Sequence, residues 1–100
     1  MRTAATVAHV DRSTIEFEAF RATITVDTYA AARMRAAALA CKAELEICHE
    51  GMASPVLSLL GILALGIAPG SRVRIRARGA DAQQAEESIR RILLARPDNP

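Results

Sequence analysis

The sequence predicts an α/β open-faced sandwich, in which a four-stranded antiparallel sheet carries three helices on one face. Segments that alternate apolar and polar residues, the pattern of half-buried strands, recur along the chain. Segments with helical spacing of apolar residues lie between them, which gives the order strand, helix, strand, strand, helix, strand, helix. Three helices can cover one face of such a sheet and leave the other face in water.

The first strand and the first helix are expected within residues 20–40. Apolar and polar side chains alternate over Phe20–Val26. Asp27 or Thr28 then suits the N-cap of an alanine-rich helix at Tyr29–Ala40, because a short polar side chain can accept a hydrogen bond from a free backbone N–H group. The apolar face of this helix is expected to carry Ala31, Met34, Ala38 and Cys41.

A hairpin and a second helix are expected in the middle of the chain. Glu44–His49 alternates again, Glu50-Gly51 is a turn candidate, and Met52–Ser54 is the returning strand. Ser54-Pro55 and Ser58 both offer starts for an apolar helix, which should end near Leu65-Gly66.

The last strand and helix have the clearest patterns. Arg72–Arg78 alternates four arginines with three apolar residues, which are expected to point to the core. Asp81 followed by Gln84 is close to a capping box for the last helix. The core-facing residues of that helix are expected to be Ala82, Ala85, Ile89 and Ile92.

The 100 residues are expected to form one domain at residues 14–96, with an arm at 1–13 and a polar tail at 97–100. The arm has no apolar signal core, and the apolar stretch Val56–Ala68 is too short to span a bilayer, so a cytoplasmic protein is expected. A formal net charge of +2 and few aromatic residues argue against nucleic acid as a partner. The arginines of the last strand are interpreted as a solvated face, softened by Glu44 and Glu46, with a patch for an acidic protein or a nucleic-acid backbone as the alternative.

Cysteine and histidine give no catalytic or metal-binding pattern. Cys41 and Cys48 lack a C-x-x-C spacing and are expected as reduced, buried thiols. His9 in the arm and His49 beside the hairpin turn are expected as exposed residues without chemistry. No metal, cofactor or enzymatic activity is predicted.

The segment Ser58–Ile67 resembles the regulatory-serine helix of the HPr proteins, the phosphocarriers of the sugar phosphotransferase system. It reads serine, two large apolar residues, glycine, two apolar residues, a small residue and then Leu-Gly-Ile. Gly70, the strand Val73–Ala77 and Gly79-x-Asp81 also fall at the spacing of that family. The resemblance runs without gaps from about Cys41 to Leu94 and implies the HPr fold.

The first half departs from the family at the active site. HPr proteins carry a histidine that receives phosphate, followed by an arginine and a proline, at the start of the first helix. Counting back without gaps, these positions hold Asp27, Tyr29 and Ala30 in this chain. A second alignment, which starts the first strand later at Ala22–Val26, deletes part of the active-site loop, and the signature is missing in either register. The resemblance therefore implies an HPr-like protein without the phosphate-accepting histidine. Asp27 is interpreted as an N-cap, with a phosphoacceptor or a fixed charge that imitates phosphohistidine as the alternatives.

The resemblance implies that Ser58 is phosphorylated by a dedicated HPr kinase, and the alternative is that Ser58 is a plain N-cap. It also implies that part of the apolar surface of Leu59, Leu60 and Leu63 docks proteins of the phosphotransferase system. The first hypothesis is a regulatory docking protein without histidine relay. The second is a phosphocarrier with an unusual acceptor, and the third is a structural homodimer in which Thr14–Phe20 pairs across subunits.

Overall fold

The computed structural model describes residues 14–96, so the arm expected at 1–13 and the tail expected at 97–100 lie outside the described residues. The elements are β1 (Thr14–Glu16), β2 (Phe20–Arg21), α2 (Thr28–Leu39), β3 (Glu44–His49), β4 (Met52–Pro55), α3 (Leu59–Ala64), β5 (Arg72–Arg78) and α4 (Ala82–Leu93).

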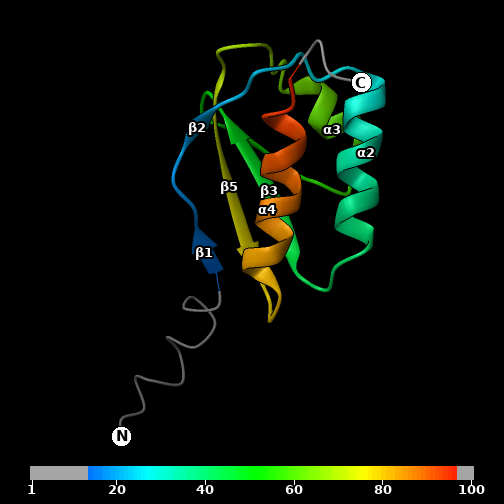
Figure 1. Cartoon of the computed structure of the whole chain (residues 1–100), viewed down its shortest axis with the longest axis vertical. Coiled ribbons are helices and arrows are strands. Elements are labelled where there is room, and N and C mark those ends of the chain that lie inside the picture. Colours follow the sequence, from blue (N-terminus) through cyan, green and yellow to red (C-terminus); the bar gives the residue numbers. More distant parts are fainter. Residues whose placement is uncertain (1–13, 97–100) are drawn as a thin grey trace, which may run out of the picture.

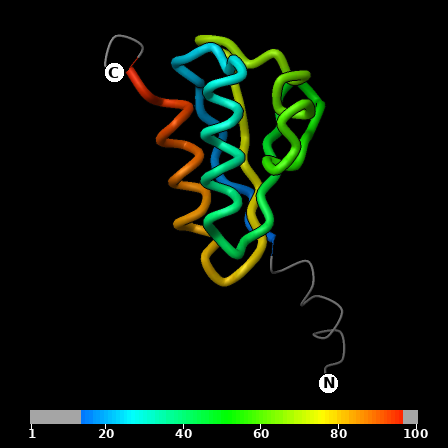
Figure 2. Tube along the Cα trace, turned by 90° about the vertical axis from the view of Figure 1, so that its right-hand side faces the viewer, coloured from blue at the N-terminus to red at the C-terminus, as the bar shows by residue number. Residues whose placement is uncertain are grey.

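Strand β5 lies in the interior of one antiparallel sheet (Figure 1). It pairs with β3 on one side and with both β1 and β2 on the other, and β4 pairs with the free side of β3. Helices α2, α3 and α4 pack on the same face, with α2 between the other two (Figure 2). The predicted open-faced sandwich is confirmed, and its first strand corresponds to the two short strands β1 and β2.

The predicted extent of the first strand, Phe20–Val26, is wrong. Only its first two residues, β2, pair with β5. Farther along, the backbone bonds to loops and helix ends instead: Thr23 N donates to Leu93 O at 2.9 Å, and Val26 N donates to Ile67 O at 2.9 Å. The alternation in burial is present, with Ala22 and Val26 buried between exposed neighbours. Alternation reports which side chains face the core, and it does not require the backbone to be paired in a sheet.

Strand β1 pairs with β5 of the same chain, a pairing that was not predicted from the sequence. Thr14–Glu16 lies antiparallel to the second half of β5, with Glu16 opposite Arg76. Phe17 N then donates to Ile75 O at 3.0 Å. The segment that the dimer hypothesis assigned to a partner subunit is thus paired with its own chain in this structure.

The β3–β4 hairpin closes with the predicted turn. Both central residues adopt positive φ angles, 51° at Glu50 and 80° at Gly51. Two consecutive left-handed residues form the type I′ turn, whose twist matches that of the flanking strands. Glycine adopts this conformation freely, whereas glutamate does so at a cost in free energy.

Helix α2 begins and packs as predicted. Asp27 is its N-cap, and Ala30, Ala31, Met34 and Ala38 are buried. Alanine at most contact positions lets the helix lie close to the sheet and to its neighbours. The core between helices and sheet also takes Ile47, Ile62, Ile75, Ile89 and Leu93, each fully or almost fully buried.

The predicted capping box of α4 is wrong. Asp81 occupies the N-cap position but makes no side-chain cap hydrogen bond. Its Oδ2 instead accepts from Lys42 N at 2.9 Å and so ties the start of α4 to the loop before β3. The amphipathic pattern of α4 is confirmed, and the helix also buries Glu86, whose carboxylate pairs with Arg90 at 2.7 Å.

The open face of the sheet carries the arginines of β5, as predicted. Arg78 pairs with Glu44, and Arg76 pairs with Glu46 at 2.9 Å. Glu16 of β1 adds a third carboxylate, 3.5 Å from Arg74, which the sequence analysis did not assign to this face. Carboxylates on both neighbouring strands thus offset this basic ladder, which favours the solvated-face interpretation.

Candidate functional site

The first part of the candidate site is the N-terminus of α2. The side chain of Asp27 accepts a hydrogen bond from Ala30 N at 2.9 Å and so satisfies one of the free N–H groups of the helix end. Val26 N, immediately before it, bonds to Ile67 O, which joins this end of α2 to the segment that follows α3. Tyr29, at the position where the resemblance places the arginine, is 73% exposed.

The second part is α3 with its cap. Ser58 is the N-cap, and its hydroxyl oxygen accepts from Gly61 N at 3.0 Å. Its backbone N–H donates to Pro55 O at 3.0 Å, which holds the cap against the end of β4. Ser58 is partly exposed, so the hydroxyl lies at the surface while it caps the helix. The N-cap role of Ser58 is confirmed.

The apolar residues of α3 divide between core and surface. Leu59 and Leu63 are half-buried and pack against the core, whereas Leu60 is 78% exposed. Ile67, the last residue of the segment that resembles the family, is buried. Of the three predicted partner-binding leucines, Leu60 is therefore the one that projects most freely into solvent.

Two further apolar side chains flank the same region and were missed in the sequence. Met52 of β4 is 57% exposed and Leu57, in the loop before α3, is 50% exposed. Arg35 of α2 donates from Nε to Leu57 O at 3.0 Å, which fixes this loop against α2. We use the name α3 surface for these two residues and the three leucines of α3: Met52, Leu57, Leu59, Leu60 and Leu63. Large apolar side chains that remain exposed are candidates for contact with a partner.

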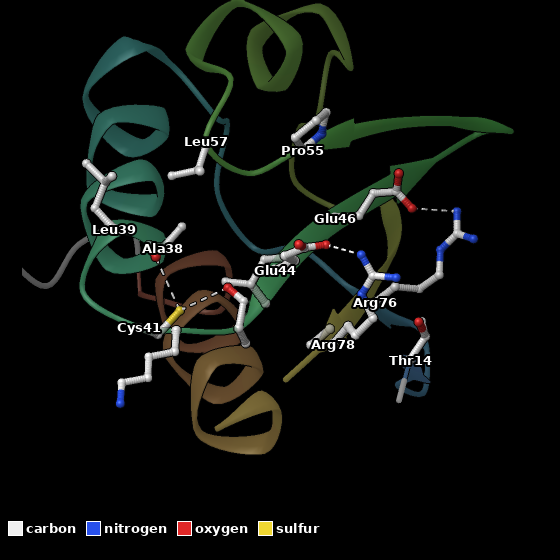
Figure 3. Close-up of a pocket in the computed structure, with 14 residues that line it drawn as sticks. Thr14, Ala38, Leu39, Cys41, Glu44, Glu46, Pro55, Leu57, Arg76 and Arg78 are labelled. Atoms are coloured by element: carbon white, nitrogen blue, oxygen red, sulfur yellow. Dashed lines mark hydrogen bonds and ion pairs between the residues drawn. The ribbon is translucent and has the colours of Figure 1, made fainter. Parts of the chain in front are cut away.

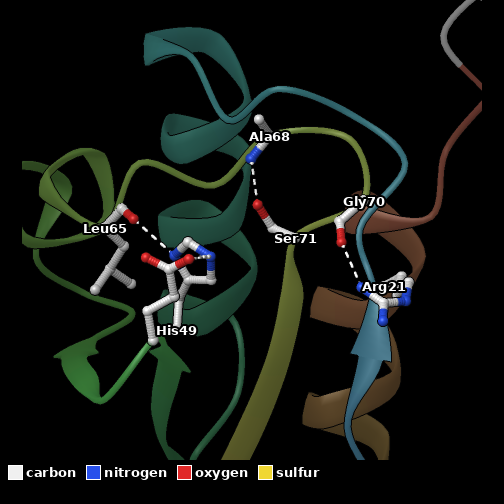
Figure 4. A network of polar contacts seen from close by, with 7 residues as sticks. Arg21, His49, Leu65, Ala68, Gly70 and Ser71 are labelled. Carbon is white, nitrogen blue, oxygen red and sulfur yellow. Dashed lines mark hydrogen bonds and ion pairs between the residues drawn. The ribbon is translucent and has the colours of Figure 1, made fainter.

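His49 does not lie where the sequence analysis expected it. Its ring is buried, and Nδ1 lies 2.8 Å from Leu65 O at the end of α3 (Figure 4). Nε2 lies 3.9 Å from the carboxylate of Glu50. The prediction of an exposed histidine is wrong because the last residue of β3 points to the helical layer, where the ring meets a free carbonyl at a helix end. His9 lies outside the described residues.

The two cysteines are free and partly buried rather than fully buried. Cys41 borders a groove of about 700 Å³ beside the end of α2, between Leu39, Leu57 and β3 (Figure 3). Burial, and after it the charge of Asp81, raise the pKa of the Cys41 thiol above its ordinary value. Cys48 lies on the open face, where Arg76 Nη2 donates to its Sγ at 3.2 Å.

Two other features concern residues 14–96 as a whole. No three histidine, cysteine, aspartate or glutamate side chains within this range gather closely enough to hold a metal ion. No helix in the same range has the length and apolar character needed to cross a membrane.

Solved structures with similar folds are phosphocarrier proteins. The structure of HPr from Bacillus anthracis matches with a TM-score of 0.75 and 23% identity, over 81% of this chain and 98% of that one. The histidine-containing phosphocarrier protein of Mycoplasma matches with a TM-score of 0.69 and 21% identity, over 78% of this chain and 90% of that one. Crh of Bacillus subtilis, described as a domain-swapped dimer, matches with a TM-score of 0.64 and 19% identity, over 77% of this chain and 90% of that one.

These likenesses show that the fold is that of the small phosphocarrier domains. The family model described as "PTS HPr component phosphorylation site" matches residues 21–94 of the 100. The chain therefore belongs to the HPr family of the phosphotransferase system. No curated protein has a sequence that matches this chain significantly.

Proposed function

We propose that this HPr-family chain is a cytoplasmic regulatory protein without enzymatic activity of its own. It docks onto proteins of the phosphotransferase system, or onto an HPr kinase, through the α3 surface. It passes no phosphate through a histidine.

The observation that carries the proposal is the side chain at the start of α2. By the gap-free count from the resemblance, Asp27 falls at the position of the phosphate-accepting histidine, and its carboxylate accepts from Ala30 N at 2.9 Å. A carboxylate in that place stabilises the positive end of the helix dipole and gives an incoming phosphoryl group no imidazole to attack it. The adjoining arginine position holds Tyr29, which has no positive charge for the phosphoryl oxygens.

The surroundings of His49 also support the absence of relay. One ring nitrogen lies 2.8 Å from Leu65 O, and the other faces the Glu50 carboxylate at 3.9 Å. To accept phosphate, the ring would have to leave its buried position, and the Glu50 charge would repel the phosphoryl group. These contacts argue against the hypothesis of an unusual acceptor at this residue.

Ser58 supports the regulatory part of the proposal. Its hydroxyl lies at the surface, at the start of α3, next to the half-buried Leu59 and the exposed Leu60. A phosphate on Ser58 would carry nearly two negative charges at neutral pH. The free N–H groups of the first helical turn tolerate that charge, while an apolar partner on the α3 surface would have to desolvate it. Phosphorylation should therefore change which partner docks and should not unfold the domain.

Intact-mass measurement after treatment with a bifunctional HPr kinase tests the regulatory part. The chain should gain one phosphate, Ser58→Ala should gain none, and Ser88→Ala, which alters a serine on α4, should gain one. No gain in the wild type, or an equal gain in Ser58→Ala, would leave Ser58 as an N-cap only.

Docking is tested by calorimetric titration with the general phosphotransferase enzyme and with the kinase. Leu60→Glu should weaken the binding of the true partner at least about tenfold, because the leucine loses its burial at the interface. Leu39→Glu, which introduces the same charge at an exposed leucine on α2, should change it less than about twofold. Equal losses in the two variants would refute docking through α3.

A homodimer is the second candidate, and the position of β1 favours it. The strand pairs over only three residues, Thr14–Glu16, at the edge of the sheet, so exchange of this short strand with a second copy is physically easy. Light scattering of the purified chain separates the candidates: a mass of one chain at micromolar concentration refutes the dimer.

A further inference from the structure

An open groove of about 750 Å³ runs between the start of α2 and the end of α4. Tyr29 and Arg33 line it from α2, and Arg91, Leu94 and Arg96 line it from α4 and the residues that follow. Helix α4 lies on the opposite side of α2 from α3 (Figure 2), and the groove is lined from α2 and α4. It is therefore separate from the α3 surface through which docking is proposed, but it shares Tyr29 with the start of α2, two residues after Asp27.

The groove holds an excess of positive charge that the described part of the chain does not neutralise. A fourth arginine in its lining, Arg90, is engaged: it pairs with Glu86 at 2.7 Å and its guanidinium lies 4.4 Å from the centre of the Phe20 ring. The other three arginines have no carboxylate within ion-pair distance among residues 14–96, and the groove contains one acidic side chain, Glu87. The groove thus concentrates a charge of +2, as large as the formal net charge of the whole chain.

The arginines of β5 show that this excess is local. Three of those four, Arg74, Arg76 and Arg78, face carboxylates from the strands on either side. Most of the arginines of β5 are thus paired with carboxylates, whereas Arg33, Arg91 and Arg96 of the α2–α4 groove are available to bind a negatively charged partner.

We propose that the α2–α4 groove binds an acidic segment of a partner protein. Guanidinium groups present paired N–H donors that match carboxylates, so Arg33, Arg91 and Arg96 can each hold an acidic side chain of an extended segment. Exposed apolar surface on Tyr29, 73% exposed, and on Leu94, 40% exposed, adds contact for aliphatic parts of the same segment. An open groove on a helical face suits an extended chain better than a small molecule, which needs an enclosed site.

Nucleic acid fits the groove less well. Single strands bind through aromatic rings on which successive bases stack, and the groove offers one ring, Tyr29. The guanidinium carbon of Arg33 already lies over that ring, 5.9 Å from its centre, so one face of the ring is partly covered.

The test uses the full chain and a fluorescein-labelled octaglutamate peptide, with binding followed by fluorescence anisotropy. Octaglutamate should bind, and a Gly-Ser repeat of the same length should not. Binding should weaken several-fold between about 20 mM and about 200 mM salt, because exposed ion pairs are screened. R33Q/R91Q/R96Q should weaken it at least about tenfold, since three exposed pairs are lost together.

The matched control removes three arginines from the open face of the sheet. R72Q/R74Q/R78Q lowers the net charge by the same amount and should change octaglutamate affinity less than about threefold. Circular dichroism melts of both triple variants establish that each remains folded.

Four results would overturn the proposal. The first is no binding of octaglutamate at low salt, and the second is an equal loss of octaglutamate affinity in the two triple variants. The third is tighter binding of octathymidylate that is lost in R33Q/R91Q/R96Q, which would make the groove a nucleic-acid site. The fourth is a gain of more than about threefold in D98N, which would assign the groove to the tail of the chain itself.

Discussion

Replacing Gly61 by alanine should loosen the contact between α3 and β4. A Cβ atom built on Gly61 would lie 2.1 Å from Ser54 Oγ and 3.1 Å from Ser54 Cβ. Ser54 is buried at 4% exposure, and its hydroxyl donates to Pro55 O at 3.0 Å. The hydroxyl must therefore turn away, which breaks that hydrogen bond, and the backbones of α3 and β4 must separate by a few tenths of an ångström.

Opposing effects set the size of the change in unfolding free energy caused by Gly61→Ala. Overpacking of this kind costs about 1–3 kcal/mol, and the lost hydrogen bond adds about 0.5–1.5 kcal/mol. Alanine within a helix is more favourable than glycine by about 1 kcal/mol. The net expectation is a loss of about 2 kcal/mol of unfolding free energy, within a range of about 0.5–3.5 kcal/mol, and a loss of about 2 kcal/mol lowers Tm by roughly 8–16 °C in a domain of this size.

A double-mutant cycle measured by urea unfolding isolates the contact. Ser54→Ala removes the hydroxyl oxygen, so Gly61→Ala should cost about 1 kcal/mol less in that background than in the wild type. The reasoning is refuted if Gly61→Ala costs the same in both backgrounds, or if it stabilises the wild type as helix propensity alone would predict.

Three other perturbations have defined outcomes. Glu50→Asn should raise the urea midpoint, with a gain of about 0.5–1 kcal/mol, because asparagine adopts the left-handed conformation of this turn more readily; an unchanged midpoint contradicts the turn argument. Arg90→Met should destabilise the domain by about 3 kcal/mol in thermal melts because it leaves the buried Glu86 carboxylate unpaired. Arg90→Met combined with Glu86→Leu should recover most of that loss, and a double variant as unstable as Arg90→Met would refute the ion-pair argument. The Cys41 thiol keeps its proton to higher pH in the folded chain than in the unfolded chain, whose thiol titrates near 9.0, so unfolding free energy should fall as pH rises above about 9. Cys41→Ala should reduce that fall, and an identical pH profile would contradict the burial argument.

The sequence was sufficient for elements whose side-chain pattern has one physical cause. The arginine–apolar alternation of Arg72–Arg78 predicted β5 with the correct face inward. The N-caps of α2 and α3, Asp27 and Ser58, were each one of two candidates that the sequence offered. Burial alternation at Phe20–Val26 was misread as pairing, because the backbone partners of this segment lie far away in sequence, in Ile67 and Leu93.

The candidate site was predicted only in part for the same reason. The leucines of α3 and the cap at Ser58 are local features, whereas Met52 and Leu57 join the α3 surface only through the hairpin and the loop before α3. The alternation of β3 puts His49 on the same inward face as Leu45 and Ile47, a signal that the prediction of an exposed ring overlooked. Its partner, Leu65 O, is a backbone group that no sequence pattern marks. The α2–α4 groove depends on two helices that residues 40–81 separate in the sequence, so its charge is visible only in the folded structure.

Phosphoenolpyruvate-dependent labelling tests the central claim most directly. The full chain is incubated with phosphoenolpyruvate and the general phosphotransferase enzyme, beside a histidine-containing HPr as the positive control, and intact masses are compared. The mass of this chain should stay unchanged while the control gains one phosphate, because the proposal places Asp27 at the position of the accepting imidazole. An acid-labile phosphate on this chain, lost in His9→Ala or His49→Ala, would contradict the account and make the protein a phosphocarrier with a relocated acceptor.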